Sequence, residues 1–124
     1  MATHTSLPIH KVAYDLIDVV TDFARNMPRP FQRPIGGEIT GDCIRITILI
    51  FRANVAQDKE PHLLALIERL QVVELMIRLA MDKRLISKAA YAKAVELTTS
   101  IGKQANGWRR AAHRPPHRGQ GRYD

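Results

Sequence analysis

The side chains that most often carry out catalysis or bind metals are scattered in this sequence. Of the five histidines, only His113 and His117 are four residues apart, and the two prolines between them rule out a helical metal-binding pair. Cys43 is the single cysteine and stands in an apolar run, which is typical of an inert core residue. No glycine-rich phosphate-binding motif is present. We therefore predict no catalytic residue, no metal site and no cofactor.

Three aspartates form the one candidate carboxylate cluster. Asp15, Asp18 and Asp22 recur at helical spacing, but their neighbours on the same helical face are polar. A solvated acidic face is therefore the better interpretation, and a phosphate backbone should avoid it.

Arginine is the residue type whose number and placement favour a function. The chain has 124 residues, 19 Lys and Arg against 12 Asp and Glu, a net charge of +7 and a pI near 10.1. This balance favours an anionic partner, either nucleic acid or an acidic protein, and arginine suits bidentate contact with phosphate or carboxylate. The candidate binding residues are Arg25, Arg29, Arg33, Arg45, Arg52, Arg69, Arg78, Arg109 and Arg110.

These arginines fall into groups. Arg25, Arg29 and Arg33 surround a segment with three prolines in seven residues, which should end the first helix and hold the three side chains at one end of the molecule. The spacing of Arg45 and Arg52 places both on one helical face. Arg78 could bind a partner or could pair with an acidic residue one turn away, either Glu74 or Asp82.

Apolar spacing predicts helices over residues 8–25, 34–57, 60–83 and 87–108. Residues 43–51 also alternate like a strand, but the rest of the chain offers that strand no partner, so we interpret the segment as a helix. The short loop at 84–87 favours antiparallel packing of the last two helices. We predict an all-α fold, an antiparallel four-helix bundle over 8–108, between a flexible leader (1–7) and a basic disordered tail (109–124).

The second and third helices are apolar over more of their circumference than the other helices of one bundle can cover. Oligomerisation would bury the excess, because large exposed apolar patches are rare on monomers. The candidate interface residues are Ile48, Phe51, Leu66, Val72, Met76 and Leu79.

The sequence shows no secretion signal and no apolar run long enough to cross a bilayer. A single cysteine also excludes a secreted disulfide scaffold. We expect a cytoplasmic protein with no membrane partner.

Six short motifs follow one another between residues 10 and 110. They are Lys11-x-x-Tyr14-Asp-Leu, Met27-Pro-Arg-x-x-x-Arg33 leading to Gly36, Ala53-Asn54, Leu70-x-x-x-Glu74-Leu-x-Ile-Arg-Leu-Ala80, Ile86-Ser87-x-x-x-Tyr91, and Ile101-Gly102-Lys-Gln-Ala-Asn-Gly107-Trp108. In this order they resemble the accessory variability determinant proteins of diversity-generating retroelements. They resemble more loosely the four-helix-bundle proteins encoded in intervening sequences of 23S ribosomal RNA genes. The Asn-Ile-Ala-Glu-Gly type of motif associated with those proteins is replaced here by Ala53-Asn54-Val-Ala-Gln57, which favours the retroelement group.

The resemblance implies a four-helix bundle that forms a homopentameric barrel with a basic surface. It further implies a non-enzymatic partner of the retroelement reverse transcriptase and its template RNA, and possible DNA contact. The reverse transcriptase would perform the chemistry, an adenine-directed mutagenic cDNA synthesis that diversifies a target gene. Arg29, Arg33 and Arg78 are the basic residues that lie within the matching motifs. The alternative is a generic RNA-binding bundle of the intervening-sequence type without a polymerase partner.

Overall fold

The computed structural model describes residues 8–112, and this part of the chain is all helical. Its elements are α1 (Pro8–Arg25), α2 (Arg29–Phe31), η2 (Gln32–Gly37), α3 (Glu38–Val55), α4 (Glu60–Asp82) and α5 (Lys88–Ala112). The predicted leader and residues 113–124 of the predicted tail lie outside the described residues.

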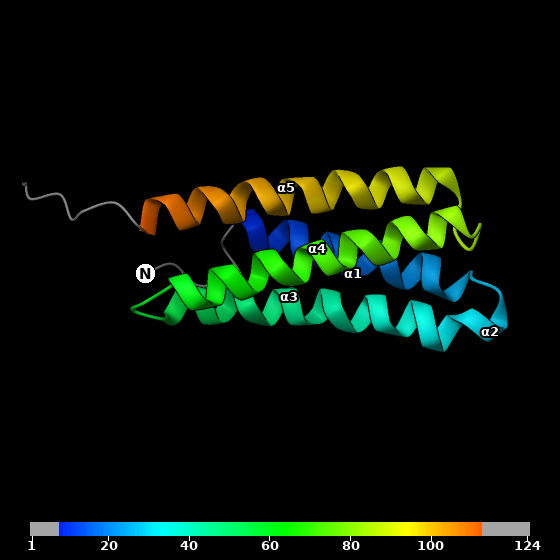
Figure 1. The fold of residues 1–124 in the computed structure, drawn as a ribbon, viewed down its shortest axis with the longest axis horizontal. Coiled ribbons are helices and arrows are strands. Elements are labelled where there is room, and N and C mark those ends of the chain that lie inside the picture. Colours follow the sequence, from blue (N-terminus) through cyan, green and yellow to red (C-terminus); the bar gives the residue numbers. More distant parts are fainter. Residues whose placement is uncertain (1–7, 113–124) are drawn as a thin grey trace, which may run out of the picture.

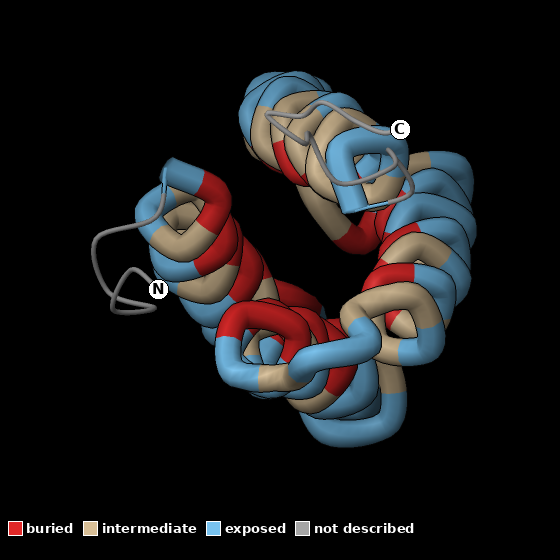
Figure 2. Tube along the Cα trace, turned by 90° about the vertical axis from the view of Figure 1, so that its left-hand side faces the viewer, coloured by how far each residue is buried: buried red, intermediate tan, exposed pale blue. Residues whose placement is uncertain are grey.

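The four long helices form an antiparallel bundle, as predicted (Figure 1). α1 packs against α3 and α5, and α4 packs against the same two helices, so the order around the bundle is α1, α3, α4, α5. Buried residues face the common centre of the four helices (Figure 2). α5 is seven residues longer than α1 and extends past its N-terminal end (Figure 1).

α1 shows how the apolar spacing sets the helix orientation. The residues that it buries are Ile9, Ala13, Leu16, Val20 and Phe23, three or four positions apart, which makes one stripe on one side of the helix. The helix ends at Arg25, as predicted, and the Asn26 side-chain amide donates to the carbonyl of Asp22 at 3.0 Å.

The chain becomes helical again at Arg29, earlier than the predicted start at 34. Pro30 lies in the first turn of α2, where a missing N–H breaks no helical hydrogen bond. Pro34 lies in η2, a π-helix, whose wider turn relieves the clash between a proline ring and the preceding turn. The Gln32 side-chain amide closes the connection by donating to the carbonyls of Arg25 (3.1 Å) and Met27 (3.0 Å).

α3 is a helix, so the strand interpretation of residues 43–51 is wrong and the helical one is confirmed. Its C-terminus is capped from the following loop. The Lys59 ammonium donates to the carbonyls of Ala53 (2.9 Å), Asn54 (3.1 Å) and Ala56 (2.9 Å). A cation is favourable there because it satisfies carbonyls that lack helical partners and complements the helix dipole.

A tight turn connects α4 to α5. Arg84 adopts a φ of 61°, the Leu85 amide donates to the Ala80 carbonyl at 2.8 Å, and the Arg84 amide donates to Met81 at 2.9 Å. This pattern is the Schellman motif, whose left-handed position usually holds glycine. Ser87 caps α5, since its hydroxyl accepts from the Ala90 amide at 3.0 Å.

α5 does not end at Trp108 but continues to Ala112, so Arg109 and Arg110 belong to the bundle and not to the tail. Arg109 lies beside the first turn of α4 and makes an ion pair with Glu60 there. This contact fixes the last turns of α5, and the two alanines that follow Arg110 have high helix propensity.

Candidate nucleic-acid interface

Eight of the nine predicted binding arginines fall in three regions of the bundle, and the ninth, Arg78, lies elsewhere on α4. One region is the end that carries the α1–α2 turn and the α4–α5 loop, one is the groove between α3 and α4, and one is the opposite end, where α5 stops. Because the side chains differ in their partners, each region is considered in turn.

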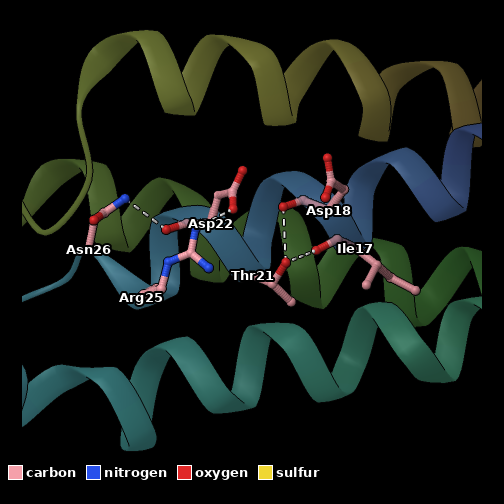
Figure 3. A network of polar contacts seen from close by, with 6 residues as sticks. All are labelled: Ile17, Asp18, Thr21, Asp22, Arg25 and Asn26. Carbon is pink, nitrogen blue, oxygen red and sulfur yellow. Dashed lines mark hydrogen bonds and ion pairs between the residues drawn. The ribbon is translucent and has the colours of Figure 1, made fainter.

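The first region is the basic end. Arg25 donates to the Asp22 carboxylate at 2.8 Å, with both side chains well exposed (Figure 3). Arg29 and Arg33 are exposed, and no carboxylate within residues 8–112 forms an ion pair with either. The structure thus brings these three arginines to one end, with two of them available to an anion.

Two further cations at this end were missed in the sequence. Arg84 lines the same hollow as Pro28 and Ser87, so the α4–α5 loop lies against the α1–α2 turn. Lys83 and Arg84 are both exposed, so they add positive charge to the end of the bundle that carries Arg29 and Arg33. An antiparallel bundle requires these two connections to share an end, and this was the signal that could have found them.

The second region is the α3–α4 groove, which collects Arg45, Arg52 and Arg69. The three side chains line a hollow of about 410 Å³ together with Ile48, Leu49, Ala65 and Glu68. Arg45 and Arg69 both donate to Asp42, whereas Arg52 has no ion pair with a carboxylate of the described residues. Sequence spacing placed Arg45 and Arg52 on one face correctly, and the structure adds Arg69 from the neighbouring helix.

The third region is the far end, where Arg109 serves the fold. Its guanidinium donates to both carboxylate oxygens of Glu60, with the shortest distance at 2.9 Å. This hydrogen bonding, and then the charge of Glu60, raises the pKa of Arg109 above its ordinary value. Arg110 is exposed beside it.

Arg78 takes the second of the two partners considered for it, Asp82, at 3.2 Å. The hydrogen bond to Asp82 and the charge of Asp82, followed by a contact with Tyr91, raise the pKa of Arg78. Arg78 is 61% exposed, so it remains accessible on the outside of α4.

The acidic face of α1 meets the predicted binding arginines at one ion pair, Asp22 with Arg25. The carboxylates of Asp18 and Asp22 point to the side of α1 on which α5 lies (Figure 3). Asp15 and Asp18 line a hollow between α1 and α5, together with Glu96 and Lys93. The face that a phosphate backbone is expected to avoid therefore lies on the side of α1 next to α5.

The described residues offer little to catalysis. Within 8–112, no group of three or more His, Cys, Asp or Glu side chains could hold a metal ion. Cys43 is fully buried, and burial, with a smaller contribution from Asp42, raises the pKa of its thiol to about 12. A thiolate nucleophile is therefore strongly disfavoured at this position. None of the helices in this range is long and apolar enough to span a membrane.

The predicted interface residues divide into two groups. Leu66 is completely buried inside the protomer, so its assignment to an interface is wrong; its side of α4 faces the core. Met76 is half-buried. Ile48, Phe51, Val72 and Leu79 are between 38% and 43% exposed, and their role in an interface stays a prediction.

Most of the exposed large hydrophobic residues form two stripes, and Tyr14 and Phe31 lie outside them. The α3 stripe consists of Ile44, Ile48, Phe51 and Val55, and the α4 stripe consists of Leu64, Val72, Leu75 and Leu79. Leu75, at 70%, is the most exposed of the eight, and it was not among the predicted interface residues. Each stripe follows one outer face of its helix at helical spacing.

Fold and surface together define a basic four-helix bundle that presents arginine clusters and two apolar stripes. The sequence matches the bAvd-like family over residues 7–112. This match covers most of the chain, which therefore belongs to the bAvd-like family of accessory variability determinants, as the motif resemblance indicated. No curated protein and no solved structure gives a significant match.

Proposed function

We propose that this protein is a non-enzymatic accessory subunit of a diversity-generating retroelement, which binds the element's reverse transcriptase and template RNA. The observation that carries this proposal is membership of the accessory variability determinant family over nearly the whole bundle. The exposed arginines support it, because guanidinium groups on several surfaces suit contact with an anionic partner. The reverse transcriptase would then perform the chemistry.

RNA is the anionic partner that the charge distribution favours. Arg29, Arg33, Lys83 and Arg84 of the basic end are exposed and make no ion pair with a carboxylate of residues 8–112, so a phosphate backbone can contact them. Binding of this kind should weaken steeply with salt, with a slope of about −0.7 per neutralised phosphate for a single strand.

The α3 and α4 stripes support self-association, with a homopentamer as the proposed state. Leu64, Val72, Leu75 and Leu79 are apolar side chains held partly in water, and their burial against a neighbour would be favourable by about 25 cal/mol per Å². Two different stripes on one protomer also suit a head-to-tail contact, and such contacts can close into a ring.

Light scattering combined with size exclusion tests this assembly. Replacement of Leu75 by Lys, on the exposed stripe, should give a helical, soluble monomer. Replacement of Leu66 by Lys is the matched contrast and should prevent folding, because that side chain lies in the core. A wild-type protein that elutes as a monomer would remove the pentamer from the proposal.

The partner is tested by co-purification. The tagged protein should recover the reverse transcriptase encoded beside it, both before and after ribonuclease treatment. Loss of the enzyme after ribonuclease treatment would mean that RNA alone bridges the two proteins. Recovery of no enzyme under either condition would argue for the generic RNA-binding alternative.

A further inference from the structure

Asp42 is a buried carboxylate on α3 that binds two arginines from different helices. Its side chain is 5% exposed, and a single oxygen, Oδ1, accepts from Arg45 Nη1 at 2.9 Å and from Arg69 Nη1 at 3.2 Å. Arg45 follows Asp42 on α3, whereas Arg69 reaches it from α4. Because a buried charge is costly unless it is paired, the two arginines explain why Asp42 can lie inside the bundle.

The same contact restrains two exposed guanidinium groups. The side chains of Arg45 and Arg69 are 56% and 41% exposed. Each guanidinium has five N–H donors, and Asp42 Oδ1 takes one from each group. The remaining donors stay available at the surface on guanidinium groups that Asp42 holds in place. A free arginine would instead lose rotamer entropy when it binds an anion.

The surrounding groove has the charge and position of a binding site for an anionic strand. Three arginines and one carboxylate line it, and Arg52 lies two turns along α3 from Arg45. At 100° per residue, Arg45 and Arg52 lie about a quarter turn from the centre of the α3 stripe. These two arginines therefore lie beside the α3 stripe, and Ile48 belongs to both the stripe and the groove lining.

We propose that the α3–α4 groove binds the phosphate groups of an RNA strand and that Asp42 is a positioning residue which orients Arg45 and Arg69 toward them. This inference rests on the proposed function, because it names one site at which that function's RNA would be held. Asp42, Arg45 and Arg69 together carry a net charge of +1. The three side chains therefore still attract an anion when Asp42 is paired with both arginines.

The proposal and general electrostatics predict opposite effects of replacing Asp42 by Asn. Asp42→Asn removes one negative charge and so raises the net charge by one, and general electrostatic attraction would then tighten RNA binding. Loss of positioning would instead weaken it, by roughly five- to tenfold if one charge-assisted contact is lost. The measurement is fluorescence anisotropy with a labelled single-stranded oligouridylate, at one fixed salt concentration.

Asp18→Asn is the matched control. It makes the same charge change on the exposed surface of α1, where the structure gives the carboxylate no arginine partner. We expect unchanged or slightly tighter binding for this variant.

A second pair of variants covers the case in which Asp42→Asn does not fold. Arg45→Lys and Arg69→Lys keep the charge but lose the planar fork. Both should weaken binding to oligouridylate, whereas Lys103→Arg, the converse exchange on the exposed surface of α5 and outside the proposed binding surfaces, should change it little. Circular dichroism establishes that each variant is helical before its affinity is compared.

The outcomes separate this inference from the proposed function. If the wild-type protein binds no oligouridylate, the groove proposal and the RNA part of the proposed function both fail. If wild type binds but Asp42→Asn and both Lys variants bind as tightly, the groove proposal alone is wrong. If the variants change the oligomeric mass and leave RNA affinity intact, the groove receives a carboxylate from a neighbouring copy, and the phosphate proposal is overturned.

Discussion

Gly36 of η2 packs directly on Ala24 of α1, so closely that a Cβ added to the glycine would lie 2.7 Å from the Ala24 Cβ. It would also lie 3.2 Å from the Ala24 Cα, and a backbone atom cannot rotate away. This contact holds the π-helical segment against α1 and so fixes the base from which Arg29 and Arg33 project.

Replacement of Gly36 by Ala should therefore destabilise the protein, by about 1–3 kcal/mol in urea denaturation, as expected for overpacking. Gly37→Ala is the control, because the nearest atom to its added Cβ is 3.9 Å away, and helix propensity should make it neutral or slightly stabilising. Combining Gly36→Ala with Ala24→Gly should restore part of the loss. Equal stability of the Gly36 and Gly37 variants would contradict the close packing.

Arg84 occupies a backbone conformation that disfavours side chains. The left-handed region costs a residue with a Cβ about 1–2 kcal/mol, and glycine avoids this cost but adds about 0.4–1 kcal/mol of chain entropy in the unfolded state. Arg84→Gly should thus raise the free energy of unfolding by about 0.5–1 kcal/mol. Lys83→Gly, at a φ of −87°, should give no such gain. A destabilised Arg84→Gly variant would mean that the arginine side chain contributes to the fold.

Lys59 satisfies three carbonyls at the end of α3 with one ammonium group. Lys59→Met keeps much of the side-chain length but leaves these carbonyls without the donor, and should cost about 1–3 kcal/mol in thermal or urea denaturation. The exposed Lys103, in the middle of α5, provides the comparison, and its replacement by Met should change stability by less than about 0.5 kcal/mol. Similar effects at the two positions would rule out a capping role.

Cys43 should resist alkylation in the native protein. Folding raises the pKa of its thiol from 9.0 to about 12, so iodoacetamide at about pH 8 should label it rapidly in urea and very slowly without denaturant. The unfolded chain loses the thiol proton first as the pH rises above about 9, so stability should fall over this range. Cys43→Ala should remove that part of the pH dependence. Rapid labelling of the folded protein would contradict burial.

The bundle itself could be predicted because it depends on local spacing. The spacing of Leu16, Val20 and Phe23 fits a helix with one buried face. Ser87 and the loop at 84–87 mark where α5 starts. The choice of helix for residues 43–51 needed one further argument, the absence of a partner strand, and the structure confirms that choice.

The features that sequence reasoning missed depend on contacts between distant residues. The burial of Asp42 depends on Arg69, 27 positions away on another helix. Arg109 was assigned to the tail by composition, but its partner Glu60 is 49 positions away. Leu66 was misplaced because α4 is apolar on several sides, and spacing alone does not show which side faces the core.

Reconstituted cDNA synthesis tests the central claim most directly. The reverse transcriptase encoded beside this protein would be assayed on its template RNA with and without the purified protein, and the cDNA would be sequenced for changes at template adenines. We predict that full-length, adenine-mutagenised cDNA requires the protein, and that the reverse transcriptase alone or the protein alone gives none. Equal yield and equal adenine mutagenesis in the presence and absence of the protein would contradict its role as an accessory subunit.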